Sequence, residues 1–387
     1  MPLCLQVEEP LSPQDLLPLA NLRNLEALEV CSANPTFFQP LLVSQLALGL
    51  TALTYLGVGG CPLSCLAHVS SCTALHALNF YCPEDFEPEE EYEQELGVSE
   101  WAALGELTGL VQLRLQYARL LTCTEESSAA ISKLRRLQFF GAETWCVGMV
   151  SALVACTQLT GLGGGWQQDD SNVESVTLPS VLALGRTSGS PPFAVLPNLV
   201  KVQQLSCIST EAFTAMTRHC SRLQTFFSVP APEICSTLPK HIPDAEPTRV
   251  RTAAVTALSA LTRLTSLEFM VDIPSELVAL VDAVCKLLPH GFRLLKVYVL
   301  GSSPVQLGTL SHLAKLQGLP HLCLQLNSES AGYMVQDAAG FLSTLSGIKC
   351  VEITGLSSEH VAACKVAQHE IEEAGLPCPK RLTFFTE

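Results

Sequence analysis

The sequence has few charged residues, few aromatic residues and an excess of acidic over basic side chains. Only 15% of its 387 residues are charged and 6% are aromatic, whereas 48% are hydrophobic. Lys and Arg number 22 against 37 Asp and Glu, which gives a net charge of −15. A surface that binds the phosphates of nucleic acids needs clustered Lys and Arg. The composition therefore predicts no nucleic-acid partner.

Metal-ligand pairs and signs of secretion are also missing. The chain has 17 cysteines but no CxxC pair, and its closest two are Cys61 and Cys65. Zinc ligands that are close in the sequence usually come as Cys or His residues only a few positions apart, and the chain has no such set. We therefore expect no metal and no cofactor. Several cysteines, among them Cys323 and Cys350, fall at apolar repeat positions, where we expect a thiol to fill the core.

The compartment follows from the same cysteines. Their odd number, the lack of an Asn-x-Ser/Thr sequon and the lack of a basic leader followed by an apolar run favour a reducing environment with free thiols. We therefore expect an intracellular protein located in the cytoplasm, with the nucleus and the ciliary axoneme as alternatives.

The sequence stretches that resemble motifs of enzymes and membrane proteins do not match those motifs. The run Gly163–Gly165 lacks the Gly-Lys-Ser/Thr ending of a phosphate loop, and His369–Glu373 is not HExxH. The uncharged window Leu41–Val58 contains several polar residues and keeps the leucine register of the chain, so we expect no membrane span. His321 beside Cys323 is the one Cys/His pair with any appeal for catalysis, and it has no motif context. We expect no catalytic residue and no enzyme.

Leucine is abundant, and its spacing changes repeatedly from three to two. From Leu313 to Asn327 the chain reads LxxLxxLxxLxLxxN. Leucines every three residues are typical of the inner side of a short helical or turn segment, and the alternation at Leu322 and Leu324 is typical of a strand. Copies of this switch end at Val30, Val58, Phe80, Leu115, Ala142, Leu162, Val202, Phe226, Phe269, Val299, Leu324 and Ile353.

This pattern resembles that of the leucine-rich repeat (LRR) family over nearly the whole chain. The Asn or Cys that follows the strand is present at Cys61 and Asn327, whereas Ala33, Ala118 and Asp272 replace it in other copies, as in an irregular, intracellular type of repeat. The resemblance implies an α/β solenoid of horseshoe form, with a parallel sheet on the concave face and short helices and loops on the convex face. We expect residues 1–387 to form a single solenoid of about twelve repeats, with insertions at about 82–100, 167–195 and 229–250.

The insertions differ in composition. The first contains an acidic run from Glu84 to Glu95, typical of a solvated segment or of a docking site for a basic partner. The second is poorly patterned, with one degenerate unit expected around Leu178–Leu184. The third is rich in proline, which precludes continuous regular structure. Beyond it we expect helices at Ser275–Leu288 and Glu359–Ala374 and a short last strand at 382–384.

The resemblance also predicts a binding surface, because the residues between the inward leucines of each strand face the concave side. In the first half these are Tyr55, Asn79, Tyr81, Gln112, Arg114, Gln116, Phe139, Glu143 and Trp166. Further along they are Lys201, Gln203, Phe227, Glu268, Met270, Lys296, Tyr298, His321, Gln325 and Glu352. The aromatic residues of the first set are either hot spots for a partner protein or covers over the backbone of neighbouring glycines.

We therefore expect a monomeric, non-catalytic scaffold or recognition module that binds another protein on its concave face. The resemblance leaves other functions open: an inhibitor or regulator of a basic enzyme, a substrate-receptor component of a ubiquitin ligase, or a structural protein of cytoskeleton or cilium. The segment before residue 19 is too short for an F-box, which weighs against the ubiquitin ligase. Salt-sensitive binding would favour the inhibitor, and salt-insensitive binding would favour the scaffold.

Overall fold

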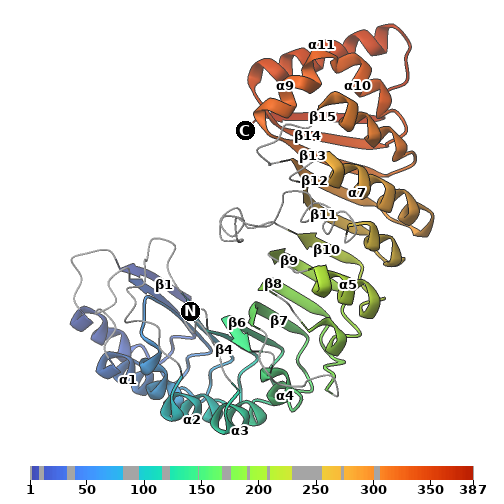
Figure 1. Ribbon diagram of the computed structural model, residues 1–387. Coiled ribbons are helices and arrows are strands. Elements are labelled where there is room, and N and C mark those ends of the chain that lie inside the picture. Colours follow the sequence, from blue (N-terminus) through green and yellow to red (C-terminus); the bar gives the residue numbers. More distant parts are fainter. Residues whose placement is uncertain are drawn as a thin grey trace, which may run out of the picture. The chain divides into compact units, whose positions relative to one another are not determined.

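Parallel strands alternate with short helices and helical turns along the chain (Figure 1). The computed structural model describes residues 2–7, 13–32, 40–81, 96–115, 123–146, 148–167, 176–189, 192–206, 210–228, 255–271, 274–299 and 306–386. The chain divides into two compact units, residues 1–197 and 198–387, which we call unit 1 and unit 2 and describe one at a time. The predicted α/β repeat fold with parallel strands is confirmed.

The sheet of unit 1 is held together by a ladder of apolar side chains. Its strands pair in parallel and in chain order. The second residue of each strand from Leu28 to Leu184 lies in register with its neighbours, and all these side chains are buried. The strands are β1 (Pro2–Val7), β2 (Ala27–Ser32), β3 (Tyr55–Gly59), β4 (Ala77–Tyr81), β5 (Gln112–Leu115), β6 (Phe139–Cys146), β7 (Gly161–Gln167) and β8 (Ala183–Gly189).

Unit 2 repeats the same arrangement. Val202, Phe226, Leu267, Leu295 and Leu322 are buried and in register on successive strands. Its strands are β9 (Lys201–Ser206), β10 (Thr225–Ser228), β11 (Ser266–Val271), β12 (Leu294–Val299), β13 (His321–Leu326), β14 (Cys350–Leu356) and β15 (Arg381–Thr386).

The leucine period of three has a direct cause in the turns that lead into the strands. In front of β5, the amide of Leu107 donates to the carbonyl of Leu104 over 3.0 Å, and the amide of Leu110 donates to that of Leu107 over 2.9 Å. Hydrogen bonds from i+3 to i place side chains three residues apart on one side of the chain. All three leucines are buried. The same bonds precede β6 at Leu134 and Leu137.

Helices cover one face of each sheet (Figure 1), and we call the opposite face the open face. In unit 1 they are η1 (Pro13–Asn21), α1 (Pro40–Gly49), η2 (Leu63–Ser71), α2 (Val98–Glu106), α3 (Glu125–Lys133), α4 (Met149–Leu153) and η4 (Phe193–Val195). In unit 2 they are α5 (Thr210–His219), η5 (Leu258–Ala260), α7 (Pro274–Leu287), η6 (Leu288–His290), α8 (Leu307–Leu310), η7 (Ser311–Lys315), α9 (Ser328–Gln336), α10 (Ala338–Thr344) and α11 (Ser358–Glu373). Among the described residues, no helix has the length and apolar character that crossing a membrane requires.

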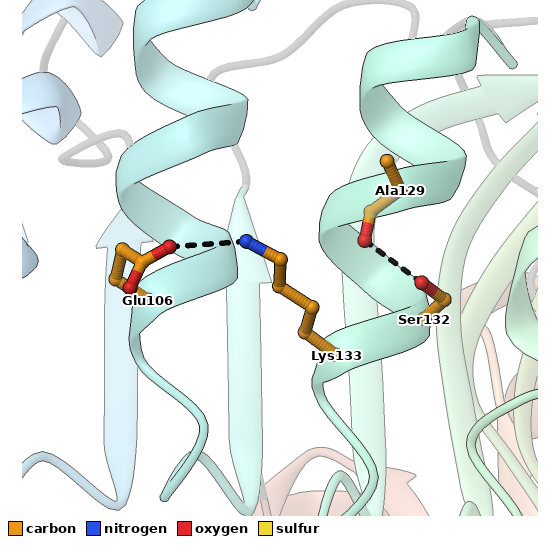
Figure 2. Close-up of polar contacts among 4 residues, drawn as sticks. All are labelled: Glu106, Ala129, Ser132 and Lys133. Atoms are coloured by element: carbon orange, nitrogen blue, oxygen red, sulfur yellow. Dashed lines mark hydrogen bonds and ion pairs between the residues drawn. The ribbon is translucent and has the colours of Figure 1, made fainter.

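Neighbouring helices are joined mainly by packing. Figure 2 shows Lys133 of α3 with its Nζ 3.0 Å from Oε1 of Glu106 on α2, and Ser132 donating to the Ala129 carbonyl within α3 over 2.8 Å. Both charged side chains are more than half exposed, so this ion pair contributes little. A Cβ at Gly105 would lie 3.2 Å from Cα of Ala130, which shows how closely the two backbones approach.

Most elements predicted from the sequence are present. The copies of the leucine pattern correspond to β2–β7 and β9–β14, the degenerate unit corresponds to β8, and the last strand corresponds to β15. The two predicted helices are α7 and α11. Strand β1 was not predicted. The acidic run 84–95 and the proline-rich segment 229–250 lie outside the described residues, and the single solenoid with three insertions stays a prediction.

One glycine of unit 2 is required by the sheet itself. The register of β14 on β15 shifts between Ile353 and Leu356, and Gly355 in this bulge has φ of 77°. A Cβ at Gly355 would overlap the carbonyl oxygen of Leu326 on β13. Gly375, after α11, has φ of 63°, but no atom lies within 4 Å of the position that its Cβ would take.

We predict that Gly355→Ala lowers the free energy of unfolding more than Gly375→Ala does. Both alanines must adopt a left-handed conformation, at about 1–2 kcal/mol each. Only Gly355→Ala must also displace a neighbouring strand, at a further ~1–3 kcal/mol. Urea unfolding followed by circular dichroism measures both, and equal losses in the two variants would contradict the role assigned to Gly355.

The cysteines that the structure describes are free thiols, as expected. Burial raises the pKa of Cys72 and Cys156 to about 11 and that of Cys220 to about 12, whereas Cys123 is exposed. The thiolate is the reactive form of cysteine. Buried thiols with raised pKa values therefore resist modification.

We predict that an alkylating reagent at neutral pH modifies Cys123 well before Cys72, Cys156 and Cys220 in the folded protein. Mass spectrometry of peptides after timed quenching measures each rate. Unfolding in urea is expected to abolish the difference. Similar rates at Cys72 and Cys123 in the native protein would show that the core around Cys72 is open.

Candidate functional site

On β3 to β6, the open face of unit 1 carries the residues that were predicted to lie between the inward leucines. Tyr55, Asn79, Gln112, Arg114 and Phe139 alternate with the buried ladder residues, and each is half-buried. Tyr81, at the end of β4, shares this face and this degree of burial. The structure thus places six of the nine predicted site residues on neighbouring strands of one face, at Tyr55, Asn79, Tyr81, Gln112, Arg114 and Phe139.

The structure does not describe the side chains of the other three predicted residues. Glu143 and Trp166 belong to β6 and β7, whose backbones pair next to each other, but their side chains are not described. Gln116 lies outside the described residues. The assignment of these three to the site stays a prediction.

Two tyrosines cover glycines of β3. A methyl group at Gly57 would lie 2.9 Å from the Tyr55 hydroxyl, and one at Gly59 would lie 2.7 Å from the ring of Tyr81. Burial, the Cys31 thiol and the Glu29 carboxylate of β2 raise the pKa of the Tyr81 hydroxyl. The absence of side chains at the two glycines makes the space in which these rings lie.

Phe139 covers glycines on three strands. Methyl groups at Gly141 of β6 and Gly161 of β7 would lie 3.0 and 2.9 Å from its ring, and one at Gly185 of β8 would lie 3.7 Å away. The guanidinium carbon of Arg114 lies 4.8 Å from the ring centre, within cation–π range. Tyr55, Tyr81 and Phe139 therefore cover bare backbone, and their rings remain half-exposed, whereas the alternative stays untested for Trp166.

Polar groups lie between the aromatic rings. Asn79 and Arg114 are register partners on β4 and β5. The Oδ1 atom of Asn79 and the Nε atom of Arg114 are shielded from solvent, and neither makes a hydrogen bond within the described part of the chain. An unsatisfied buried polar atom costs about 1–3 kcal/mol. A ligand that offers a donor to Asn79 and an acceptor to Arg114 would pair with these two atoms once side-chain movement exposes them.

The open face of unit 2 has more charged groups. Tyr298 of β12 donates a short hydrogen bond to Glu268 of β11, and Lys296 Nζ lies 3.8 Å from the same carboxylate. Burial and the Glu268 hydrogen bond raise the pKa of Tyr298. The Glu268 carboxylate on β11 is therefore a hydrogen-bond partner of Tyr298 and an ion-pair partner of Lys296 on the neighbouring strand β12.

Three potential metal ligands meet on β13 and β14. His321, Cys350 and Glu352 offer ligand atoms that all lie within 4.8 Å of one another, and His321 Nε2 is 3.3 Å from Glu352 Oε1. The prediction that Cys323 and Cys350 fill the core is wrong, because both are half-buried on the open face. Spacing along the sequence does not reveal this cluster because its members come from neighbouring strands. The sequence feature that could have revealed the cluster is that His321 and Cys350 occupy the same strand position in consecutive repeats.

Comparisons with known proteins show low similarity and add no function. No protein-family model and no curated protein matches the chain. It is similar to the solved structure of an internalin (inlF) from Listeria monocytogenes, at 15% identity over 88% of this chain and 82% of that chain, with a TM-score of 0.41. It is also similar to the leucine-rich repeat-containing protein LegL7 from Legionella pneumophila, at 11% identity over 96% and 98% of the two chains, with a TM-score of 0.37.

The class of protein follows from the chain's own geometry. Inward leucines, turns closed by hydrogen bonds three residues apart, and strands that pair in parallel and in order are the features of a leucine-rich repeat fold. Repeat proteins of this kind present extended sheet surfaces that bind other proteins.

We predict that Tyr81 ionises above the ordinary tyrosine pKa of about 10, because burial and the neighbouring Cys31 and Glu29 raise its pKa. Unfolded Tyr81 loses its proton first, so the free energy of unfolding falls as pH rises above about 10. Ultraviolet titration of the wild type and Tyr81→Phe measures this, with Glu29→Gln expected to lower the pKa of Tyr81 only in part. A smaller absorbance change at about pH 10 in Tyr81→Phe than in the wild type would contradict the prediction, because Tyr81 would then ionise at the ordinary tyrosine value.

Proposed function

We propose that this protein is a non-catalytic recognition scaffold that binds a partner protein on the open face of unit 1. The observation that carries the proposal is the set of half-buried aromatic rings and an arginine on β3 to β6, held in place by their own neighbours. Aromatic residues and arginine dominate the binding energy of protein interfaces. The set is Tyr55, Asn79, Tyr81, Gln112, Arg114 and Phe139, with Gln116, Glu143 and Trp166 as further members.

Preorganisation supports this proposal. A side chain that is already fixed loses little conformational entropy when a partner covers it. Phe139 lies under Arg114 and over glycines of β6 and β7, and Tyr81 lies over Gly59. A partner therefore meets rings whose positions are set, beside an Arg114 Nε that still needs an acceptor.

The chemistry of the partner surface follows from these groups. A carbonyl or carboxylate oxygen would accept from Arg114, an amide would donate to Asn79, and apolar side chains would pack on the rings. An intracellular partner, met in the cytoplasm, fits the free thiols of the described cysteines.

The test compares Arg114→Ala with Lys296→Ala, which alters the corresponding strand position on the open face of unit 2. Partners are captured from native extract, identified, and purified for calorimetry. We predict that Arg114→Ala weakens binding of the specific partner by at least ~2 kcal/mol, about 30-fold in Kd. Lys296→Ala is expected to leave Kd unchanged, and circular dichroism checks that both variants fold.

A deletion of residues 84–95 separates the scaffold from the alternative inhibitor of a basic enzyme. If the scaffold proposal is right, the deletion leaves Kd unchanged and added salt has little effect. Loss of binding only on deletion, in a complex that salt dissociates, would instead support docking through the acidic run. Equal Kd values for wild type and Arg114→Ala would refute the proposed surface.

A further inference from the structure

The open face of unit 2 brings together three side chains whose donor atoms are typical of a transition-metal site. His321 begins β13 and Cys350 begins β14, and the two are register partners. Glu352 follows Cys350 by two residues and therefore points to the same face. Imidazole nitrogen, thiolate sulfur and carboxylate oxygen are the ligands that proteins use for zinc.

We propose that His321, Cys350 and Glu352 bind a divalent transition-metal ion of the zinc class, with the fourth position open to water or to a donor from another molecule.

The geometry requires only small movements of the side chains. Ligand atoms around a tetrahedral zinc ion lie about 3.3–3.8 Å apart, given metal–ligand bonds of about 2.0–2.3 Å. The three donor atoms here all lie within 4.8 Å of one another, and the His321–Glu352 pair is at 3.3 Å. Rotation about the side-chain bonds of Cys350 and Glu352 can close the remaining difference.

The state of His321 is consistent with this assignment. Its Nε2 atom is shielded from solvent and makes no hydrogen bond within the described residues, although it lies within ion-pair distance of Glu352. Its side chain as a whole is 36% exposed and that of Glu352 is 30% exposed. An ion can therefore reach the cluster from solvent, and it would satisfy the Nε2 lone pair on arrival.

Neighbouring charges do not block the site. Lys296, in register with Cys323 on the next strand, lies 3.8 Å from Glu268, which offsets its charge. Arg381 of β15 is the register partner of Cys350 and is exposed, so that solvent screens it. Binding requires the Cys350 thiol to release its proton to solvent, so affinity is expected to fall as the pH is lowered.

The test is a cobalt titration of the full chain after chelation, in the presence of a phosphine reductant. Wild type is expected to bind one equivalent of Co²⁺ with a thiolate-to-cobalt charge-transfer band and tetrahedral d–d bands, and Zn²⁺ is expected to displace it. Cys350→Ser is expected to abolish the charge-transfer band. His321→Gln and Glu352→Gln are expected to weaken binding by at least about tenfold.

Cys31→Ser is the matched control, because Cys31 is also a half-buried thiol of a sheet strand but lies in unit 1. It should bind like wild type, and circular dichroism confirms that each variant folds. Failure of the folded wild type to saturate with one equivalent would overturn the proposal. So would an unchanged band in Cys350→Ser, or an equal loss in Cys31→Ser. The proposed recognition surface on β3 to β6 would be unaffected by either result.

Discussion

The structure depends on the mutual burial of one apolar ladder by neighbouring strands. Leu78 of β4 has Leu56 and Leu113 as register partners on either side, and all three are buried. Burial of a leucine side chain stabilises a fold by about 1.5–3 kcal/mol. A single repeat cannot bury its own ladder residue, so each strand needs its neighbours. This requirement explains why the strands follow chain order and why the turns keep the same three-residue spacing.

The same requirement leaves the open face free to vary. Residues between the ladder positions do not contribute to the core, so they can differ from repeat to repeat without loss of the fold. In unit 1, glycines at Gly57, Gly59 and Gly141 remove side chains from this face, and large rings lie over the gaps. Rings that cover backbone are fixed in place, so the same contacts that complete the sheet also prepare a surface for binding.

The open face of unit 2 carries polar and charged residues instead. Tyr298 and Lys296 both contact Glu268, and His321 lies beside Glu352. Side chains of neighbouring strands lie about 5 Å apart on such a face. Polar groups at equal strand positions in consecutive repeats therefore meet as pairs and clusters, although roughly 30 residues separate them in the chain. A polar pair or cluster on this face therefore needs side chains from two neighbouring repeats.

The leucine spacing alone was enough to predict the repeats and the inward positions within each strand. Leucines spaced by three and then by two predicted the turns and strands, because hydrogen bonds from i+3 to i and the alternation of a strand impose those periods on side chains that share a core. The rule that leucines point inward also selected the outward residues, and Tyr55, Arg114 and Phe139 lie where it predicted. The strand β1 escaped prediction because Leu3 and Leu5 alternate without the preceding leucines at a spacing of three.

Which outward residues touch one another depends on the packing of neighbouring strands. The position of Phe139 over Gly161 and Gly185, and the meeting of His321 with Cys350 and Glu352, depend on the register between strands. Local sequence spacing carries no information about that register when loops of varying length separate the repeats. The sequence placed Cys350 in the core, whereas its register with His321 placed it among possible metal ligands.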